Sequence, residues 1–215
     1  MAVVSNEITE DDLIQIRPSW YARGPDQDVN IWSRIHPRFQ SHDGCIVDLG
    51  CLGWNRDFDN IGSDNWAGYF FGKKRVIGVD PQETPNEHSE LFKGFISDFS
   101  GKANLTSTGL GASMVPSDEG QYDVLTWEDF KSQYDIQSIS ILKINIEGAE
   151  WDLLDAFDDF SIDQICVSFH NFLPKFNNET FIQRTNTIVQ KLIDNGYQMI
   201  DLGIYGWKIF LKIES

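Results

Sequence analysis

Acidic side chains follow apolar runs at several places in the sequence, and the first of them stands beside a glycine-rich turn. In the segment VDLGCLG at 47–53, Asp48 closes an apolar run, and Gly50, Cys51 and Gly53 form the turn. Glycines let a ligand approach the backbone closely, and a helix that begins after the turn can receive negative charge. The segment therefore indicates a ligand-binding turn, although a tight turn that binds nothing is equally compatible with two isolated glycines.

A second acid, Asp80, ends the apolar segment VIGVD and precedes Pro81. Ligands of open α/β sheets bind at the carboxyl ends of the strands, where one carboxylate can accept both hydroxyls of a ribose. Asp80 lies 30 residues after Gly50, and the GxGxxG spacing is missing. Because a dinucleotide fingerprint expects about twenty residues at this point, the spacing disfavours NAD and permits another adenosine ligand. The alternative interpretation of Asp80 and Pro81 is a surface turn.

A third acid, Asp98, is followed by an aromatic residue, Phe99, at the end of another apolar run. A carboxylate accepts a hydrogen bond from an exocyclic amine, and a ring offers a stacking face, so an adenine could use both. The same residues could also form a turn before Ser100 and Gly101.

These side chains need a sheet that brings the strand ends together. Short apolar runs occur at 45–49, 75–79, 93–97, 139–145 and 163–169, separated by glycine turns and by segments of helical spacing. This order is typical of an α/β protein whose parallel sheet is covered by helices on both faces. We therefore predict five buried strands with their carboxyl ends at one edge.

The segments between and after these runs predict helices and a closing pair of strands. Crossover helices are expected at 54–71 and 147–157, and Thr126 is expected to cap another helix. A long amphipathic helix is expected from Asn178 to Gly196. The last two runs, YQMIDL and WKIFLKI, predict an antiparallel hairpin at the end of the sheet.

Residues 1–42 differ from the rest and are predicted to form an N-terminal helical arm or lid, leaving residues 43–215 as the main domain. Thr9 with its acidic neighbours predicts a helix start, and the apolar residues from Ile31 to Phe39 recur at helical spacing. The aromatic residues of this arm could close over a bound substrate or pack in the core. They are Trp20, Tyr21, Trp32 and Phe39.

Composition narrows the function classes. Lys and Arg number 17 against 33 Asp and Glu, which gives a net charge of −16. Nucleic-acid affinity comes largely from cations that displace counterions, so a nucleic-acid partner is disfavoured. Three cysteines without a metal-binding spacing favour a reducing, cytoplasmic location. The acidic N-terminal residues do not resemble a signal peptide, and no run has the length of a membrane span, so we expect no membrane partner.

The segment KINIEGAE at 143–150 identifies a family. Read with VDLG, VIGVDPQ, TWEDF and ICVSFHNF in the same order, it resembles the FkbM-type branch of class I S-adenosylmethionine-dependent methyltransferases, whose hallmark at this strand is close to KIDVEGAE. The resemblance covers roughly residues 44–213. It implies a Rossmann-like seven-stranded methyltransferase sheet with helices on both faces and an antiparallel C-terminal strand. The implied activity is methyl transfer from S-adenosylmethionine to a hydroxyl, often on a sugar or small metabolite.

The resemblance also implies roles for individual residues. Asp48, Gly50 and Gly53 correspond to the donor's methionine end, and Cys51 in the same turn could touch the donor without acting as a nucleophile. Asp80 corresponds to the residue that binds the donor's ribose, and Asp98 to the residue that binds its adenine. Lys143, Asn145 and Glu147 correspond to the surroundings of the reactive centre, with Asn145 standing where the family usually has Asp.

Methyl transfer to a hydroxyl needs a base that removes the acceptor's proton. His170 follows an expected strand and titrates near neutrality, so it is the first candidate, and Glu147 is the second. The alternative for His170 is a packing or turn residue. Lys143 could stabilise an oxyanion or simply extend to the edge of the sheet. A Mg²⁺ or Mn²⁺ ion is conceivable at this edge, but Asn145 in place of Asp makes us expect none.

The acceptor pocket is predicted to form from the N-terminal arm, the loop after Asn145 and the segment from His170 to Phe172, with a sugar-like or small-metabolite acceptor. The second hypothesis is a catalytically silent S-adenosylmethionine-binding module on the same fold. An RNA methyltransferase would want a basic groove, which the net charge disfavours.

Overall fold

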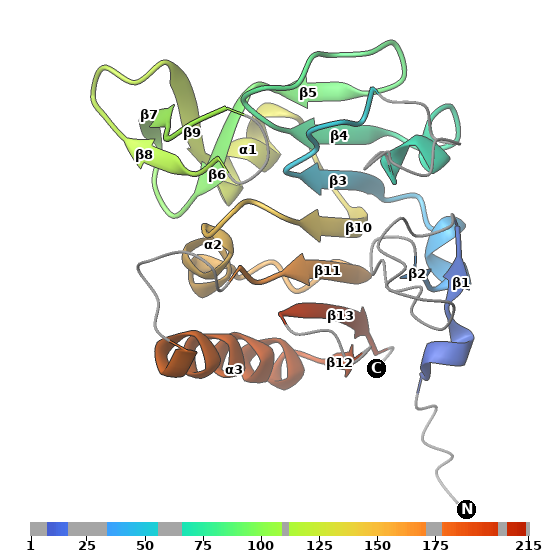
Figure 1. The fold of residues 1–215 in the computed structure, drawn as a ribbon. Coiled ribbons are helices and arrows are strands. Elements are labelled where there is room, and N and C mark those ends of the chain that lie inside the picture. Colours follow the sequence, from blue (N-terminus) through green and yellow to red (C-terminus); the bar gives the residue numbers. More distant parts are fainter. Residues whose placement is uncertain are drawn as a thin grey trace, which may run out of the picture.

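The structure is a computed structural model of the 215-residue chain, and it describes residues 8–16, 34–55, 66–108, 112–170, 178–201 and 206–213. Figure 1 shows a central sheet with α-helices packed against it, a second sheet beside one end of the strands, and the N-terminal segment beside the other end.

Seven strands form the central mixed sheet in the order β12-β13-β11-β10-β3-β4-β5. Their bounds are β3 Cys45–Leu49, β4 Val76–Val79, β5 Glu90–Phe92, β10 Ile139–Ile144, β11 Gln164–Ser168, β12 Tyr197–Ile200 and β13 Trp207–Lys212. Neighbouring strands are parallel, except that β13 is antiparallel to both β11 and β12. The strands predicted at 45–49, 75–79, 139–145 and 163–169 are confirmed, and so is the closing antiparallel pair.

The central strands are buried on both faces of the sheet. Val47 and Leu49 of β3 belong to one apolar cluster, whereas Ile46 between them belongs to a second cluster on the other face. Successive side chains of a strand point to opposite faces, so a strand covered on both sides needs apolar residues at nearly every position. This explains why the sequence shows continuous apolar runs here.

Three α-helices pack against the same face of the sheet: α1 (Trp127–Gln133), α2 (Glu150–Ala156) and α3 (Asn178–Asp194). The predicted cap is confirmed, because Thr126 Oγ1 accepts the Asp129 N–H at 3.2 Å. Among the helices that the structure describes, none combines the length and the apolar character needed to cross a membrane.

The opposite face is covered by short 3₁₀ helices, η3 (Pro37–Gln40) and η4 (Ala67–Phe70), and by buried indole rings. Trp54 and Trp66 are each 1% exposed. A crossover helix was predicted at 54–71. In the part of this range that the structure describes, the only helix is η4, and residues 56–65 lie outside the described residues. We expected helices on both faces of the sheet. Among the described residues, α-helices cover one face, and the other face carries 3₁₀ helices instead.

The N-terminal segment contains the one-turn 3₁₀ helix η1 (Glu10–Asp12) and the antiparallel strands β1 (Ile14–Gln15) and β2 (Arg34–Ile35). The helix start at Thr9 is confirmed, since Asp12 Oδ2 accepts the Thr9 N–H at 2.6 Å. The helical spacing predicted up to Phe39 is wrong over residues 34–36.

Proline explains that difference. The residue before a proline avoids the helical region, and His36, which precedes Pro37, has φ −71° and ψ 127°. The chain therefore stays extended through β2 and turns only at η3.

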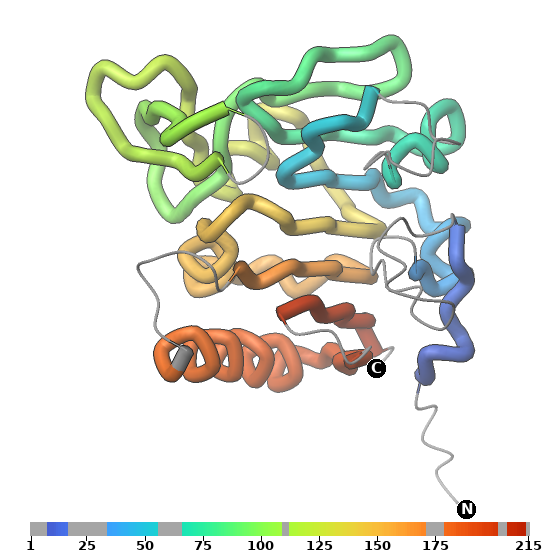
Figure 2. The backbone as a smooth tube through the Cα atoms, in the orientation of Figure 1, coloured from blue at the N-terminus to red at the C-terminus, as the bar shows by residue number. Residues whose placement is uncertain are grey.

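The same segment lies at the amino ends of the parallel strands. The His36 N–H donates to Gln164 Oε1 at 3.1 Å at the start of β11, and Phe39 is buried in the second cluster. Figure 2 shows this segment at the end of the sheet opposite to α2 and the second sheet. The described part of the arm therefore does not lie over the carboxyl ends of the strands, where we expected a lid. Trp20, Tyr21 and Trp32 lie outside the described residues.

A second, four-stranded sheet has the order β6-β9-β7-β8. Its strands are β6 (Gly94–Ser97), β7 (Gly101–Leu105), β8 (Met114–Pro116) and β9 (Tyr122–Thr126). The strand predicted at 93–97 exists, but its place in the central sheet was wrong: β5 pairs with β4, and β6 turns away to pair with β9. Gly94 permits this, because a Cβ there would stand 2.4 Å from the Asp123 carbonyl oxygen.

Candidate functional site

The carboxyl ends of β3, β4, β10 and β11 meet at one edge of the central sheet (Figure 1). The register aligns Asp48 of β3 with Lys143 of β10, and Leu49 with Val79 of β4. The predicted site residues that follow these four strands are therefore neighbours, and they are Gly50, Asp80, Asn145 and His170.

Asp48 and Lys143 form a buried ion pair. Lys143 Nζ lies 2.6 Å from Asp48 Oδ1 and also donates to the Gly50 carbonyl oxygen at 2.6 Å. The indole N–H of Trp66 donates to Asp48 Oδ2 at 2.8 Å. Both side chains of the pair are at most 5% exposed. Sequence reasoning missed Trp66. Because Asp48 and Lys143 bind each other, this structural pairing competes with the donor-binding role predicted for Asp48 and the oxyanion-stabilising role predicted for Lys143.

The glycine turn after β3 depends on two positive φ angles. Gly50 has φ 81° and Gly53 has φ 96°. A Cβ on Gly50 would stand 1.9 Å from the Asn145 carbonyl oxygen, so the turn and the segment after β10 touch backbone to backbone. The Asn145 N–H in turn donates to the Leu49 carbonyl oxygen at 3.0 Å. Only glycine fits this approach.

Cys51 is buried in this turn at 2% exposure. Burial, reinforced by the carboxylates of Asp48 and Asp80, raises the pKa of the Cys51 thiol well above its ordinary value. The side chain therefore stays a neutral thiol. It packs against strand β4, where Gly78 has no side chain and so leaves room for the Cys51 sulfur.

Glu83 is a further buried acid that sequence reasoning missed. Its Oε2 accepts the Gly53 N–H at 2.5 Å, and its Oε1 accepts the Asn55 side-chain amide at 3.0 Å. The carboxylate thus holds the glycine turn from the β4 side and occupies a backbone donor of that turn. The only hint in the sequence is its place three residues after Asp80.

Asp80 follows β4 and is 7% exposed. Its Oδ1 accepts the Gln82 N–H at 2.7 Å across the buried Pro81. Burial raises the pKa of the Asp80 carboxyl to about 6, against the opposing effects of the Gln82 hydrogen bond and Lys143. Glu83 and Asp48 add to the rise. A strongly shifted carboxyl at the ligand edge of a sheet is typical of a functional site.

The turn between β10 and α2 is strained and held by one acid. Glu147 has φ 52° and Gly148 has φ 100°, and a left-handed non-glycine residue is uncommon outside such sites. Glu150, fully buried, accepts the Ile146 N–H at 3.1 Å and the Gly148 N–H at 2.9 Å. Helix α2 therefore begins at Glu150, three residues later than predicted.

The same acid holds the imidazole of His170. His170 Nδ1 lies 2.6 Å from Glu150 Oε1, and its Nε2 lies 3.7 Å from Glu147 Oε2. Burial by itself lowers the pKa of His170, but the hydrogen bond and charge of Glu150, with the charge of Glu147, outweigh it, so the net pKa is raised. Lys143 opposes that rise. Sequence reasoning proposed His170 and Glu147 as candidate bases. It missed Glu150 as the partner of His170, although Glu150 lies in the KINIEGAE segment.

The second sheet reaches this turn. Ser113, just before β8, donates its hydroxyl to the Glu147 carbonyl oxygen at 3.1 Å. Asp98 and Phe99, by contrast, follow β6 of the second sheet; Asp98 is exposed and accepts the Ser97 hydroxyl at 3.2 Å. Their predicted adenine contact therefore depended on a strand that is not in the central sheet. Asn171 and Phe172 lie outside the described residues.

Within the described residues, no group of three or more His, Cys, Asp or Glu side chains is arranged to hold a metal ion.

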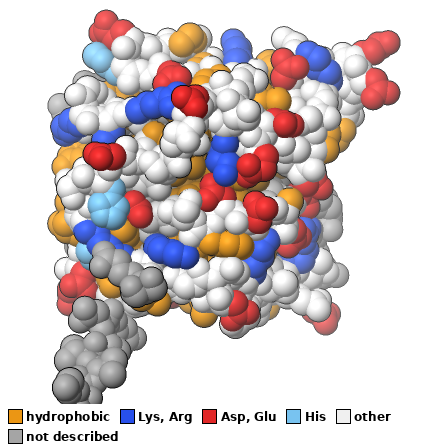
Figure 3. Space-filling view, turned by 180° about the vertical axis from the view of Figure 1, so that it is seen from behind, with side chains coloured by type: hydrophobic (Ala, Val, Ile, Leu, Met, Phe, Trp, Pro, Cys, Tyr) orange, Lys and Arg blue, Asp and Glu red, His pale blue; other side chains and the backbone are white. Residues whose placement is uncertain are grey.

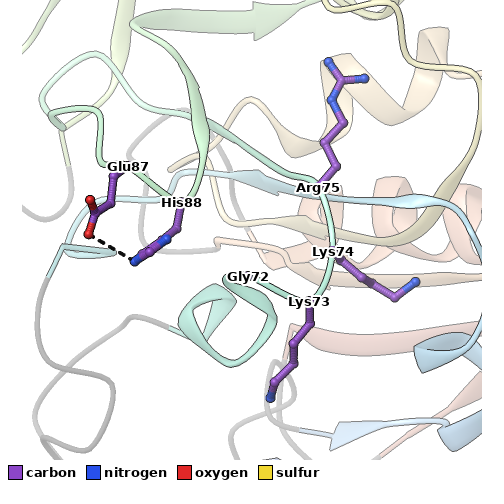
Figure 4. Close-up of a pocket in the computed structure, with 6 residues that line it drawn as sticks. All are labelled: Gly72, Lys73, Lys74, Arg75, Glu87 and His88. Atoms are coloured by element: carbon purple, nitrogen blue, oxygen red, sulfur yellow. Dashed lines mark ion pairs between the residues drawn. The ribbon is translucent and has the colours of Figure 1, made fainter.

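A pocket of about 440 Å³ lies at the opposite, amino edge of the sheet and is lined by Gly72, Lys73, Lys74, Arg75, Glu87 and His88. In Figure 4 its cationic side chains point in different directions. Arg75 is held by Glu90 at 2.7 Å. The pocket is thus separate from the candidate site and offers no convergent set of donors.

Comparison with known families assigns the chain. The methyltransferase FkbM domain matches residues 76–199, a range that contains Asp80, the KINIEGAE turn and His170. The chain belongs to the FkbM methyltransferase family. Neither the comparison with curated proteins nor the comparison with solved structures gives a match.

Proposed function

We propose that this protein is an S-adenosylmethionine-dependent methyltransferase that methylates a hydroxyl of a sugar-like or small-metabolite acceptor. The proposal rests on the family match and on one observation above the others: a buried carboxylate, Asp80, and a carboxylate-held imidazole, His170, follow strands whose ends share one edge. The strand order with its reversed β13 supports a Rossmann-like methyltransferase domain over residues 43–215. The arm proposed for residues 1–42 would be an addition to that unit, and its described residues Leu13, Ile35 and Phe39 pack into the apolar cluster of the sheet.

The residues at this edge fit the donor. Asp80 is a buried acceptor whose described hydrogen bond comes from Gln82, so it has capacity for ribose hydroxyls, which are donors. Gly50 and Gly53 hold the turn that would border the methionine end. When bound, the donor supplies a methyl group that its sulfonium makes electrophilic.

This chain's own residues would orient the acceptor and take its proton. The imidazole Nε2 of His170 faces Glu147, and this side of the ring can receive the hydroxyl proton as the oxygen attacks. Glu147 would then stabilise the imidazolium by charge. The Lys143 ion pair keeps the ends of β3 and β10 in register beneath these groups.

The acceptor is expected to be small and polar. His170 offers a hydrogen bond to an acceptor hydroxyl, and Ser113 brings the second sheet to the turn that carries Glu147. On the face in Figure 3, Lys and Arg side chains are interspersed with Asp and Glu side chains. With the net charge of −16, this supports an acceptor other than a nucleic acid. The three free, buried cysteines Cys45, Cys51 and Cys166 are compatible with a reducing, cytoplasmic compartment.

Two measurements test the proposal. Calorimetry with S-adenosylmethionine and with its demethylated product should give binding heat for both. Incubation with methyl-labelled donor and a panel of sugars, sugar nucleotides and phenols should label at least one hydroxyl. The absence of heat and of a thermal shift with either ligand would refute donor binding.

A second candidate function is a silent donor-binding module. It is favoured by Asn145 in place of the family's Asp and by Glu83, which already occupies the Gly53 N–H. Tight donor binding without methyl transfer to any member of the panel would support this candidate against the enzyme.

Asp80→Asn should weaken donor binding by about 10- to 150-fold, the scale of hydrogen bonds to a charged group. The wild-type affinity should also fall as the pH drops through about 6, because the carboxyl of Asp80 becomes protonated there and loses acceptor capacity. Calorimetry from pH 5 to pH 8 measures both effects. The variant's affinity should be nearly flat over this range.

The same substitution should raise stability at high pH. A carboxyl whose pKa is raised by folding destabilises the folded state above that pKa, and the cost disappears as both states become protonated. Asp80→Asn should therefore raise the free energy of unfolding by about 1 kcal/mol or more at pH 8, and by less at pH 5. Asp118→Asn, at an exposed acid, is the control and should change neither property. Unchanged donor affinity in Asp80→Asn would remove Asp80 from the site.

A further inference from the structure

One side chain, Glu150, organises the acid–imidazole cluster at the carboxyl edge. It is fully buried at the first position of α2, its two oxygens accept the N–H groups of Ile146 and Gly148, and its Oε1 lies 2.6 Å from His170 Nδ1. The two backbone donors belong to the strained turn that carries Glu147. The His170 ring follows the neighbouring strand, β11.

We infer that Glu150 is a positioning residue that holds the His170 ring with its proton on Nδ1, so that Nε2 is the atom that takes the acceptor's proton. The role of Nε2 rests on the proposed function. The tautomer and its cause do not depend on it.

The chemistry of the contact selects the tautomer. An ionised carboxylate only accepts hydrogen bonds, and a neutral imidazole has one donor and one acceptor nitrogen. With Nδ1 at 2.6 Å from Glu150 Oε1, the neutral ring must place its proton on Nδ1, which leaves Nε2 as the basic nitrogen. A short hydrogen bond to a charged acceptor inside the protein is among the stronger ones. The ring orientation is therefore fixed before any substrate binds.

The groups around the ring agree with this assignment. Glu150 from α2 faces Nδ1, Glu147 from the turn faces Nε2 at 3.7 Å, and Lys143 from β10 acts at longer range against protonation. A distance of 3.7 Å is too long for a hydrogen bond. Glu147 thus contributes charge next to Nε2 without fixing the ring.

Glu150 also sets where Glu147 stands. The positive φ of Glu147 would be costly without the backbone hydrogen bonds that hold the turn, and two of these end on Glu150. One buried carboxylate therefore places both the base and the acid beside it.

In the reaction, the acceptor oxygen forms a bond to the methyl carbon as the methyl–sulfur bond breaks, and that bond's electron pair returns to sulfur. The acceptor's proton passes to His170 Nε2. The resulting imidazolium lies between Glu150 and Glu147, and the proton then leaves to solvent.

The first experiment needs neither donor nor acceptor. Nitrogen-15 NMR of protein whose histidines carry ¹⁵N in the ring reports which ring nitrogen holds the proton. The chain has only four histidines, so the spectrum is simple. His170→Gln assigns the resonance. The neutral ring of wild-type His170 should be protonated at Nδ1. A neutral ring protonated at Nε2 would overturn the inference, whatever the activity of the protein.

The second experiment uses Glu150→Gln, which keeps the size of the side chain and removes its charge. The pKa of His170 should fall, because burial then acts with less opposition. Glu147→Gln should lower the pKa of His170 less. His42, paired with Asp163 at 2.7 Å at the other edge of the sheet, is the internal control, and its NMR signals should be the same in both variants as in the wild type. An unaltered His170 titration in folded Glu150→Gln would contradict the inference; if this variant does not fold, the wild-type tautomer decides.

The kinetic test follows once an acceptor is found. Glu150→Gln should lower turnover by about 10- to 100-fold and move the acidic limb of the pH–rate profile to lower pH, in step with the His170 titration. A purely structural role would lower the rate without moving that limb. If NMR shows the tautomer and its shift but no acceptor is ever methylated, the proposed function fails while the placement by Glu150 stands.

Discussion

His170→Ala should lower turnover by about two to four orders of magnitude and leave donor affinity unchanged, because it removes the group that takes the acceptor's proton. The ring touches no residue of the glycine turn in the hydrogen bonds and ion pairs described, so donor contacts there should survive. Initial rates with labelled donor, together with calorimetry, separate the two effects.

His42→Ala is the matched control. This histidine is also paired with a carboxylate, but it lies at the amino edge of the sheet, so its loss should leave turnover near the wild-type value. An active His170→Ala protein would transfer the role of base to Glu147 or to a bound metal. Loss of that activity with a chelator would then favour the metal.

Lys143→Ala should lower the free energy of unfolding by about 3–5 kcal/mol, the usual cost of leaving one member of a buried ion pair without its partner. Asp48 is 1% exposed, and without Lys143 its negative charge would keep only the Trp66 N–H among the partners described above. Urea unfolding followed by tryptophan fluorescence measures the change.

Two further variants interpret that result. Lys102→Ala breaks an exposed ion pair with Asp123, at 2.8 Å, and should cost at most about 1 kcal/mol. Adding Asp48→Asn to Lys143→Met removes the unpaired charge and should recover a large part of the loss. If Lys143→Ala is as mild as Lys102→Ala, Lys143 does not hold β3 to β10, and a catalytic role for it gains support.

The edge at which the site lies could be predicted from the sequence. Strands buried on both faces need apolar residues at consecutive positions, and β3, β4, β10 and β11 therefore appear as short continuous runs. Because parallel strands end at the same edge, the residues after each run had to lie together. Asp80 and His170 were found for this reason, and the KINIEGAE segment added the family.

The partners of those residues could not be predicted in this way. Glu150 and His170 are 20 residues apart, and Asp48 and Lys143 are 95 apart. A hydrogen bond over such a distance depends on strand register and on the left-handed turn at Glu147, which no local pattern specifies. The glutamate at 150 looked like an ordinary acid in the first turn of a helix.

Placement outside the central sheet was also decided by long-range packing. The segment at 93–97 has the composition of a buried strand, but Gly94 lets the Asp123 backbone approach, and β6 joins β9. Asp98 and Phe99 therefore follow a strand of the second sheet. The sequence alone thus determined the strands, the edge they share and the acids and imidazole that follow them, since burial and chain direction are written locally. Tertiary structure alone decided which of those groups are paired, which nitrogen of His170 faces Glu150, and which predicted strand joins the second sheet, because these depend on contacts between residues far apart in the chain.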